Sequence, residues 1–284
     1  MGHVSYTIRP KRGLPSGTQI RNVAMITFDV NPPIATDQVD PHDPSRGTDP
    51  EKQALVTIDA TPPAVAQVLA WGSAWSPAFL EFLQSSDLGA GGYAIPLVPG
   101  QPLVLPWSNV NRLSIRFSED VVVGAGDIFL YGDGQAPLAA VDFSYDPQTF
   151  TATWTLATPP TADRYRVSLP GTVRDRVGNV LGDGFTVAFN ALPGDATRDG
   201  RVNALDLVQV RRKLTRTVAD PGSGVTRYTP FDDINGDGRI SVLDIGALRR
   251  RLYTQLPTAP APLPVSPTAN GRSDLDDPAT GLLG

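Results

Sequence analysis

The sequence predicts a mainly β protein, with a β-sandwich in the middle of the chain and a small α-helical module of two loop–helix repeats after it. Short runs of alternating apolar and polar residues recur through the middle of the chain, separated by turns. The 284 residues include 28 Pro and 27 Gly with aromatics at only 7%, which favours many turns and short strands over long helices. Near the C-terminus, two twelve-residue segments repeat the same pattern of oxygen-bearing side chains, each followed by helical apolar spacing.

The N-terminal segment 1–36 predicts part of a β hairpin. Residues 4–10 (VSYTIRP) and 19–30 (QIRNVAMITFDV) alternate like strands, and KRGLPSGT between them is typical of a turn. Two strands cannot bury a sheet face by themselves. We therefore expect the terminal hairpin of an upstream β repeat, whose earlier strands precede Met1 or which packs on the next domain. The phrase ITFDVNPPIAT resembles the end of a repeat common in bacterial surface proteins.

Residues 37–53 predict an exposed linker, because the stretch DQVDPHDPSRGTDPEKQ is polar and rich in Pro and Asp. Two interpretations of its acidic side chains remain open. The four carboxylates hold an interdomain calcium ion, or they are solvated charges of a surface loop. The residues concerned are Asp40, Asp43, Asp49 and Glu51.

Residues 54–192 predict the β-sandwich. The segment 76–89 is expected to form a short helix that packs on the sheet through Phe79, Phe82 and Leu83. In TFTATWTL, the alternation places four apolar residues on one face and threonines mostly on the other, as a half-buried antiparallel strand requires. These apolar residues are Phe150, Ala152, Trp154 and Leu156. The expected strands cover 54–60, 64–71, 112–118, 127–132, 140–146, 149–157, 164–170 and 185–189.

Three phrases of this region carry a family resemblance. LSIRFSEDVVV, SYDPQTFTATWTL and TVRDRVGN resemble the bacterial Ig-like domains of surface-layer and adhesive proteins. In such domains DRVGN, here Asp175 to Asn179, is a turn between late strands. The resemblance implies an Ig-like β-sandwich with a spacer or display role and with no catalytic residues.

The two twelve-residue segments are DATRDGRVNALD at 195–206 and DINGDGRISVLD at 233–244. Each has oxygen-bearing side chains at positions 1, 3, 5, 9 and 12 and Gly at position 6, which is the spacing of an EF-hand-type calcium loop. Ca²⁺ takes six to eight oxygens, and the Gly allows the sharp bend past the metal. The alternative is a pair of Asp/Gly turns without a metal.

Two Ca²⁺ ions are therefore expected, one in each loop. The expected ligands of the first ion are Asp195, Thr197, Asp199, the carbonyl of Arg201, Asn203 (directly or through water) and Asp206. The expected ligands of the second ion are Asp233, Asn235, Asp237, the carbonyl of Arg239, Ser241 and Asp244. Because Thr197 stands where an Asp or Asn is usual, the first site is expected to be the weaker.

The segments after the loops, LVQVRRKL and IGALRRRL, have helical apolar spacing, and no amphipathic helix precedes either loop. Residues 194–256 therefore resemble a type I dockerin, the calcium-dependent module by which bacterial extracellular proteins dock onto cohesin domains. The resemblance implies a cohesin-like partner. It also implies partner-binding positions at Ala204, Leu205, Arg211, Arg212, Val242, Leu243, Arg249 and Arg250. Alternatively, the arginines are merely solvated and favour the negative ends of the helix dipoles.

Several classes of function are disfavoured. A net charge of -5 argues against nucleic acid, and no run of about twenty apolar residues could span a membrane. The two histidines, His3 and His42, leave no plausible base for a Ser-His-Asp triad in the folded core. We expect surface charge rather than catalysis from Glu81, Asp87, Glu119 and Asp120. We expect core or edge positions, rather than a sugar-stacking platform, for Trp71, Trp75, Trp107, Tyr93 and Tyr131.

The sequence thus predicts a monomeric, extracellular or cell-surface, non-enzymatic docking and display protein. The alternative is the attachment end of a polysaccharide-degrading glycoside hydrolase whose catalytic domain lies upstream. The N-terminus has no apolar core of the signal-peptide kind, so we expect a C-terminal piece of a longer protein. Residues 257–284 are Pro- and Ala-rich without periodicity and are expected to be a disordered tail.

Overall fold

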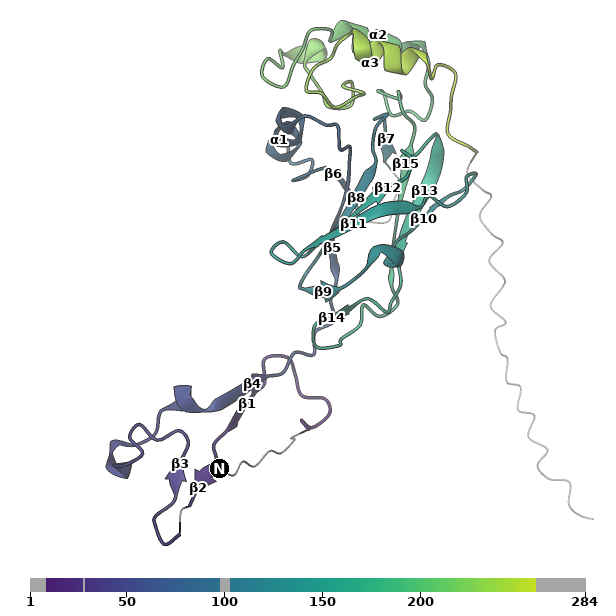
Figure 1. The fold of residues 1–284 in the computed structure, drawn as a ribbon. Helices are drawn as coiled ribbons and strands as arrows, with labels where there is room; N and C mark the ends of the chain where they lie inside the picture. Colours follow the sequence, from purple (N-terminus) through teal and green to yellow (C-terminus); the bar gives the residue numbers. More distant parts are fainter. Residues whose placement is uncertain (1–8, 28, 98–102, 259–284) are drawn as a thin grey trace, which may run out of the picture.

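The computed structural model describes residues 9–27, 29–97 and 103–258. Figure 1 shows three parts in chain order: an N-terminal unit, a β-sandwich and a helical module. The N-terminal unit lies at one end of the sandwich, beside β9 and β14, and the two helices α2 and α3 lie at the opposite end. The mainly β fold class, with a small helical module after the sandwich, is confirmed.

The N-terminal unit differs from the expected hairpin. Strand β1 (Gln19–Asn22) pairs with β4 (Ala54–Thr57), and β2 (Met25–Ile26) pairs with β3 (Ile34–Ala35). The expected long strand over 19–30 is therefore wrong, because its two halves have different partners. The expected strand at 54–60 does not join the sandwich. All four residues of β4 are exposed, so this strand has no buried apolar face with which to join a core. Most of the expected strand 4–10 lies outside the described residues.

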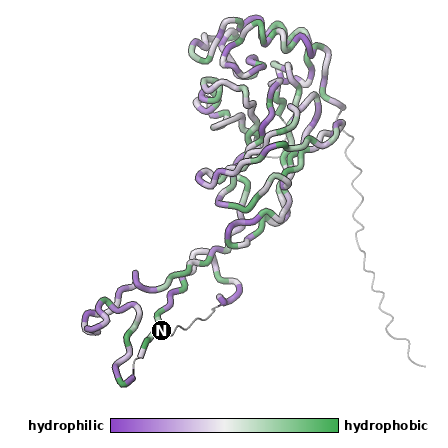
Figure 2. The backbone as a smooth tube through the Cα atoms, viewed as in Figure 1, coloured by the Kyte–Doolittle hydropathy of each residue, from purple (hydrophilic) through white to green (hydrophobic). Residues whose placement is uncertain are grey.

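The expected linker 37–53 stays exposed over most of its length and is strongly hydrophilic (Figure 2), but it is folded. Two 3-10 helices, η1 (Pro44–Arg46) and η2 (Pro50–Lys52), each begin at an Asp-Pro pair. The side chain of Asp43 accepts from Ser45 N, and that of Asp49 accepts from Glu51 N. An Asp cap followed by a proline with fixed φ starts a helical turn, which the interpretation as a plain linker overlooked.

The sandwich consists of two facing sheets. The first has five strands in the order β11-β12-β8-β5-β6, and the second has four in the order β10-β13-β15-β7. All neighbours are antiparallel except β15 and β7, which are parallel. A short β9 (Val121–Val122) and β14 (Arg174–Asp175) pair at the end that faces the N-terminal unit. The strands of the first sheet are β5 (Val65–Trp71), β6 (Tyr93–Ile95), β8 (Arg112–Phe117), β11 (Ala140–Asp146) and β12 (Thr151–Leu156). Those of the second are β7 (Val104–Leu105), β10 (Phe129–Gly132), β13 (Asp163–Leu169) and β15 (Phe185–Ala191).

The predicted faces are confirmed within β12, whereas Phe150 lies before the strand, is half-buried and has a φ of 53°. Ala152, Trp154 and Leu156 are buried, whereas the three threonines between and before them are half-buried. The Trp154 ring packs on Phe143 of β11 at a centroid distance of 5.2 Å. The turn predicted at 175–179 is also present, since the buried Asp175 side chain accepts from the backbone N–H groups of residues 177, 178 and 179.

The helical module carries α2 (Ala204–Arg212), α3 (Val242–Arg249) and the short η4 (Gly224–Thr226). Each helix begins in a capping box, with Asn203 and Asp206 for α2 and Ser241 and Asp244 for α3. Val210 of α2 and Leu248 of α3 are fully buried, as the helical apolar spacing predicts. Among the helices of the described residues, none is long and apolar enough to cross a membrane.

The helix α1 (Pro77–Ser85) and the module share one core with the sandwich. Residues 76–89 were expected to pack on the sheet, but Phe79 contacts the rings of Trp75 and Trp107 at 4.9 and 6.1 Å, at the end of the sandwich nearest the module. Phe82 of the same helix contacts Tyr228 of the module at 5.0 Å. Buried apolar residues form one cluster that runs from the strands into α2 and α3. The module is therefore not joined to the sandwich by a free tether.

We predict that Trp154→Ala lowers the free energy of unfolding by about 3–5 kcal/mol, because it removes a fully buried ring and leaves a cavity. Urea unfolding of the full chain measures this loss. The matched control is Val141→Ala in the neighbouring strand, where the side chain is 66% exposed and the cost should stay within about 0.5 kcal/mol. Equal losses in the two variants would show that Trp154 does not support the core.

Candidate functional site

The first loop closes around two buried aspartates at its ends. Asp195 and Asp206 are both 0% exposed. Asp195 accepts from Asp199 N at 3.1 Å and from Gly200 N at 2.8 Å. Asp206 accepts from Thr197 N at 2.9 Å. Gly200, at loop position 6, has a φ of 88°, the left-handed conformation that glycine adopts without strain. The predicted bend at position 6 is therefore present.

The second loop repeats this geometry. Asp233 and Asp244 are 0% exposed, and Asp233 accepts from Asp237 N at 3.2 Å and from Gly238 N at 2.8 Å. Asp244 accepts from Asn235 N at 3.3 Å. Gly238 has a φ of 87°, matching Gly200 in the first loop. The two segments thus share one backbone conformation as well as one sequence pattern.

Burial beside other carboxylates raises the pKa of the first aspartate in each loop. Desolvation raises the pKa of Asp195 to about 6, and the nearby Asp206 and Asp199 add to the shift. Desolvation likewise raises the pKa of Asp233 to about 7, with Asp244 and Asp237 adding to it. The salt bridges within the described part of the chain do not involve any of these residues. A bound cation would therefore relieve a repulsion that no basic side chain offsets.

The donor set fits a hard divalent cation such as Ca²⁺. In each loop the candidate ligands are oxygens, from carboxylates, a hydroxyl or amide, and a backbone carbonyl. Among the described residues, one group of three carboxylates has its oxygens within 4.8 Å of one another: Asp59, Glu119 and Asp175. The three carboxylates of each loop do not meet this spacing. Since each oxygen lies 2.3–2.6 Å from a Ca²⁺ ion, ligands on its opposite sides are about 5 Å apart. Carboxylates on opposite sides of one Ca²⁺ ion can therefore lie farther apart than 4.8 Å.

The two repeats hold each other's loops. In the first loop, Val202 N donates to Thr254 O, in the segment after α3, at 2.8 Å. In the second loop, Ile240 N donates to Arg216 O, in the segment after α2, also at 2.8 Å, and Thr215 N donates back to Ile240 O. Each loop is thus completed by the segment that follows the other repeat's helix, so neither repeat forms its full set of backbone hydrogen bonds alone.

The positions that the dockerin resemblance assigns to partner binding are all exposed. Leu205 and Leu243, at equivalent positions of the two repeats, are each 63% exposed, and Val242 is 73% exposed. The others are Ala204, Arg211, Arg212, Arg249 and Arg250. They lie on α2 and α3 or on the residue just after α3, at the end of the molecule away from the sandwich (Figure 1).

Most of the other candidates lie in local contacts or on the surface, and Glu119 belongs to the carboxylate group with Asp59 and Asp175. Three of the four linker acids are used locally, because Asp43 and Asp49 cap their 3-10 helices and Asp40 pairs with Arg46 at 3.3 Å. The fourth, Glu51, is exposed in the first turn of η2. Asp120 accepts from Tyr145 Oη at 2.7 Å and pairs with the Arg176 guanidinium. Glu81 and Asp87 are exposed on or beside α1, and Glu119 is half-buried. Of the five aromatics considered, Trp75, Trp107 and Tyr93 are buried, Trp71 is half-buried, and Tyr131 is exposed and stacks on Phe129.

Sequence reasoning missed the residues that tie the spacer between the repeats to the loops. Tyr228 is buried, and its hydroxyl donates to Asp233 Oδ2 at 2.7 Å. Asp232 is fully buried and pairs with Lys213 Nζ at 2.5 Å. The sequence feature that could have indicated them is the presence of two aromatic residues, Tyr228 and Phe231, in the spacer just before the second loop. Two aromatic residues so close together indicate that the spacer packs against another part of the protein.

The helical module matches a known family. The family model of the dockerin type I domain matches residues 193–254, and this segment is a type I dockerin domain. A second family model, a domain of unknown function (DUF7619), matches residues 1–42. The comparison with curated proteins gave no match.

Solved structures show only distant likeness. A crystal structure of the S-layer protein SbsC aligns at 19% identity over 32% of this chain and 13% of that chain, with a TM-score of 0.25. A second structure, of its N-terminal part, aligns at 18% identity over 32% of this chain and 23% of that chain, with a TM-score of 0.27. A type II cohesin–X-dockerin complex from Acetivibrio cellulolyticus aligns at 13% identity over 46% of this chain and 83% of that chain, with a TM-score of 0.20. The chain thus covers less than a quarter of the S-layer chains.

We predict opposite pH dependences with and without calcium. Because the folded-state pKa values of Asp195 and Asp233 lie above the ordinary value, these groups contribute stability below about pH 4 and lose it as pH rises through about 6 and 7. In EDTA, the melting temperature of the dockerin should fall from pH 5 to pH 8. With excess calcium it should rise over the same range, because the ion binds the ionised carboxylates.

Thermal unfolding of the full chain, followed by circular dichroism near 222 nm, measures both trends. The control is Asp233→Asn in EDTA, which should flatten the fall because the amide cannot ionise. A melting temperature that rises with pH in EDTA would contradict the assignment of raised pKa values.

Proposed function

We propose that the chain is a calcium-dependent docking and display module of an extracellular bacterial multidomain protein, and that its dockerin binds a cohesin-type domain. One observation carries the proposal: the segment matched by the dockerin type I family contains two loops of one geometry, with all the residues assigned to partner binding exposed. The chain itself acts by binding rather than by catalysis. Its place is outside the cell or on its surface.

Two Ca²⁺ ions act as structural cations. Once bound, each neutralises the carboxylates that its loop brings together. Asp195 and Asp206 would hold the first ion and Asp233 and Asp244 the second, together with the side chains and carbonyls between them. A ligand at about a thousand times its dissociation constant stabilises the folded state by about 4 kcal/mol. Two such contributions are comparable to the whole stability of a small domain.

The ions also position the docking surface. Asp206 and Asp244 are at the same time calcium ligands and the third residues of α2 and α3, where they accept from the backbone N–H groups of Asn203 and Ser241. A loop that closes on an ion therefore fixes the start of its helix. The residues just before these aspartates, Leu205 and Leu243, are the exposed apolar positions of the proposed partner surface.

The surface has two chemical components. Apolar side chains lie at the start of each helix, and arginine pairs lie at the end, at Arg211–Arg212 and Arg249–Arg250. All four arginines are exposed. A partner face that matches this surface carries an apolar patch flanked by carboxylates, because rim charges of opposite sign steer and orient association. The first repeat also has a groove of about 480 Å³ beside α2, lined by Leu205, Val208 and Val225 among others.

We predict that calcium binding requires the last ligand of each loop. Asp206→Ala and Asp244→Ala should each abolish one of two binding events in isothermal titration of EDTA-treated full chain. Each should also remove about 4 kcal/mol of calcium-dependent stability. Asp183→Ala, which removes an exposed acid of the sandwich, is the control and should change neither. Calcium binding of unaltered stoichiometry in both loop variants would exclude these sites.

We predict that the partner surface works in two orientations. Rotation by half a turn brings Arg249 and Arg250 to the places of Arg211 and Arg212, so replacing one pair by Ala should weaken binding little. Replacing both pairs should weaken it more than 100-fold, since a central interface arginine contributes about 2 kcal/mol or more.

A panel of purified type I and type II cohesin domains, with calcium and with EDTA, is the probe. Arg227→Ala, which removes an exposed arginine of the spacer, serves as the control. Unchanged binding by the fourfold variant would contradict the surface. Binding to none of the cohesins in calcium, while both ions bind, would contradict the proposed partner class.

A further inference from the structure

The second calcium loop lies directly on the end of the sandwich. Three consecutive backbone carbonyls of the loop, those of residues 234, 235 and 236, accept hydrogen bonds from sandwich residues. The middle carbonyl belongs to Asn235, a predicted ligand. The bonds run from Ser108 N to Ile234 O at 3.0 Å, from Asn109 Nδ2 to Asn235 O at 2.6 Å and from Ser76 N to Gly236 O at 2.9 Å. The backbone course of this loop is therefore set in part by residues more than a hundred positions away in the sequence.

An indole ring fills the space under this loop. Gly236 has a φ of 71°, and a Cβ atom there would lie 2.3 Å from the Trp75 ring. Glycine is therefore required for the loop to approach the ring this closely. Trp75 Nε1 donates to Asn109 Oδ1 at 2.9 Å. The Asn109 amide thus connects the indole to the loop carbonyl and has its own orientation fixed by both.

The first ligand of the same loop is held by a tyrosine that is packed on the sandwich. Tyr228 is 1% exposed, and its hydroxyl donates to Asp233 Oδ2 at 2.7 Å. Its ring lies 5.0 Å from that of Phe82 in α1. Phe231, three residues later, lies 5.8 Å from both Tyr93 and Trp107. The carboxylate of Asp233 is therefore oriented through a contact with α1.

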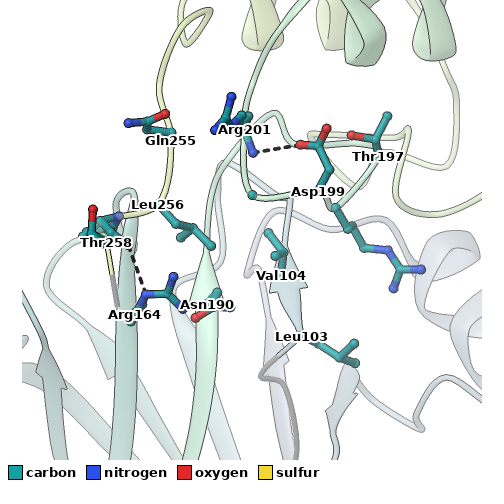
Figure 3. Close-up of a pocket in the computed structure, with 13 residues that line it drawn as sticks. Leu103, Val104, Arg164, Asn190, Thr197, Asp199, Arg201, Gln255, Leu256 and Thr258 are labelled. Carbon is teal, nitrogen blue, oxygen red and sulfur yellow. Dashed lines mark hydrogen bonds between the residues drawn. The ribbon is translucent and has the colours of Figure 1, made fainter. Parts of the chain in front are cut away.

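The first loop borders an open groove instead. Figure 3 shows a groove, with a volume of about 740 Å³, between the first loop and the sandwich edge. Thr197, Asp199 and Arg201 line it from the loop, and Val104 and Arg164 line it from the sandwich. The first loop does reach the junction through its non-ligand residue Arg198, whose guanidinium carbon is 3.9 Å from the Phe231 ring centroid.

From this asymmetry we propose that the second calcium site is a composite of dockerin and sandwich, in which Tyr228, Asn109 and Trp75 are positioning residues for its ligands. The calcium affinity of the second site then depends on these three residues, whereas that of the first does not. Coupling between two sites is reciprocal. Calcium at the second loop therefore also stabilises the junction, and it holds the dockerin in a fixed orientation on the sandwich.

The physical basis is the orientation of ligands before the ion arrives. A metal ligand with a fixed hydrogen-bond partner loses less conformational entropy when the ion binds. Removal of such a partner typically lowers metal affinity 10–100-fold. In Tyr228→Phe the ring and its packing on Phe82 remain, and only the bond to Asp233 is lost. The substitution thus tests the positioning of the ligand without opening the core.

The test measures each site separately in the full chain by calorimetric titration with CaCl₂. Asp206→Ala leaves the second site to be titrated, and Asp244→Ala leaves the first. We expect Tyr228→Phe and Asn109→Ala to weaken the second site about tenfold or more and the first site less than threefold. The matched control is Tyr145→Phe, which also removes a hydroxyl that donates to a carboxylate at 2.7 Å, but to Asp120 of the sandwich. It should change neither site.

A second readout does not require the variants in which only one calcium site remains. All four tryptophans lie in the sandwich, and two of them, Trp75 and Trp107, lie at the junction. Calcium should therefore change the tryptophan emission of the full chain although the dockerin contains no tryptophan. Trp75→Phe should abolish most of this change.

The composite second site rests on the calcium binding proposed above, and different outcomes contradict each of the two proposals. A chain that binds no calcium at either loop contradicts the proposed function itself. Normal calcium binding at the second site in Tyr228→Phe and Asn109→Ala overturns the composite site alone. Equal weakening of both sites, or tryptophan emission that ignores calcium while both ions bind, also overturns it.

Discussion

The constraint on which the C-terminal half of the structure depends is the burial of aspartate. Asp195, Asp206, Asp233 and Asp244 are all fully buried, two in each loop. Backbone N–H groups of the loops satisfy several of their oxygens, but hydrogen bonds do not remove the charge. The raised pKa values of Asp195 and Asp233 express the same cost, because burial and neighbouring carboxylates favour the protonated form. A divalent cation bound between these carboxylates would remove that cost and would close the loop that starts each helix.

Contacts with the sandwich connect the two loops to the rest of the chain. Strand β15 runs through Leu192 and Gly194 into the first loop, and both residues donate to the carbonyls of Leu105 and Pro106 at the end of the sandwich. The aromatic rings of α1, the sandwich end and the spacer then fill the space beneath the second loop. The loops of the dockerin face the sandwich, and α2 and α3 face outward. The residues of the proposed partner surface are therefore exposed.

How far the sequence predicts this structure depends on the range of the interactions involved. The strands around Trp154, the turn at Asp175 and the start of each helix at Asn203 and Ser241 follow from periodicity and capping, which are local. The candidate ligands follow from spacing within twelve residues. The partner of β4 and the contact of Trp75 with Gly236 could not be predicted, because each joins segments far apart in the chain and neither leaves a periodic pattern. The exposed β4 shows the limit: its alternation is that of a strand, but alternation does not say which strand it pairs with.

The most direct test of the central claim, that calcium orders the dockerin on a sandwich that is already folded, is amide hydrogen exchange of the full chain with calcium and with EDTA. With calcium, amides of residues 195–256 should gain protection, and those of β12 should exchange equally slowly in both conditions, because that strand lies in the sandwich core. Equal protection of residues 195–256 in calcium and in EDTA would contradict the account.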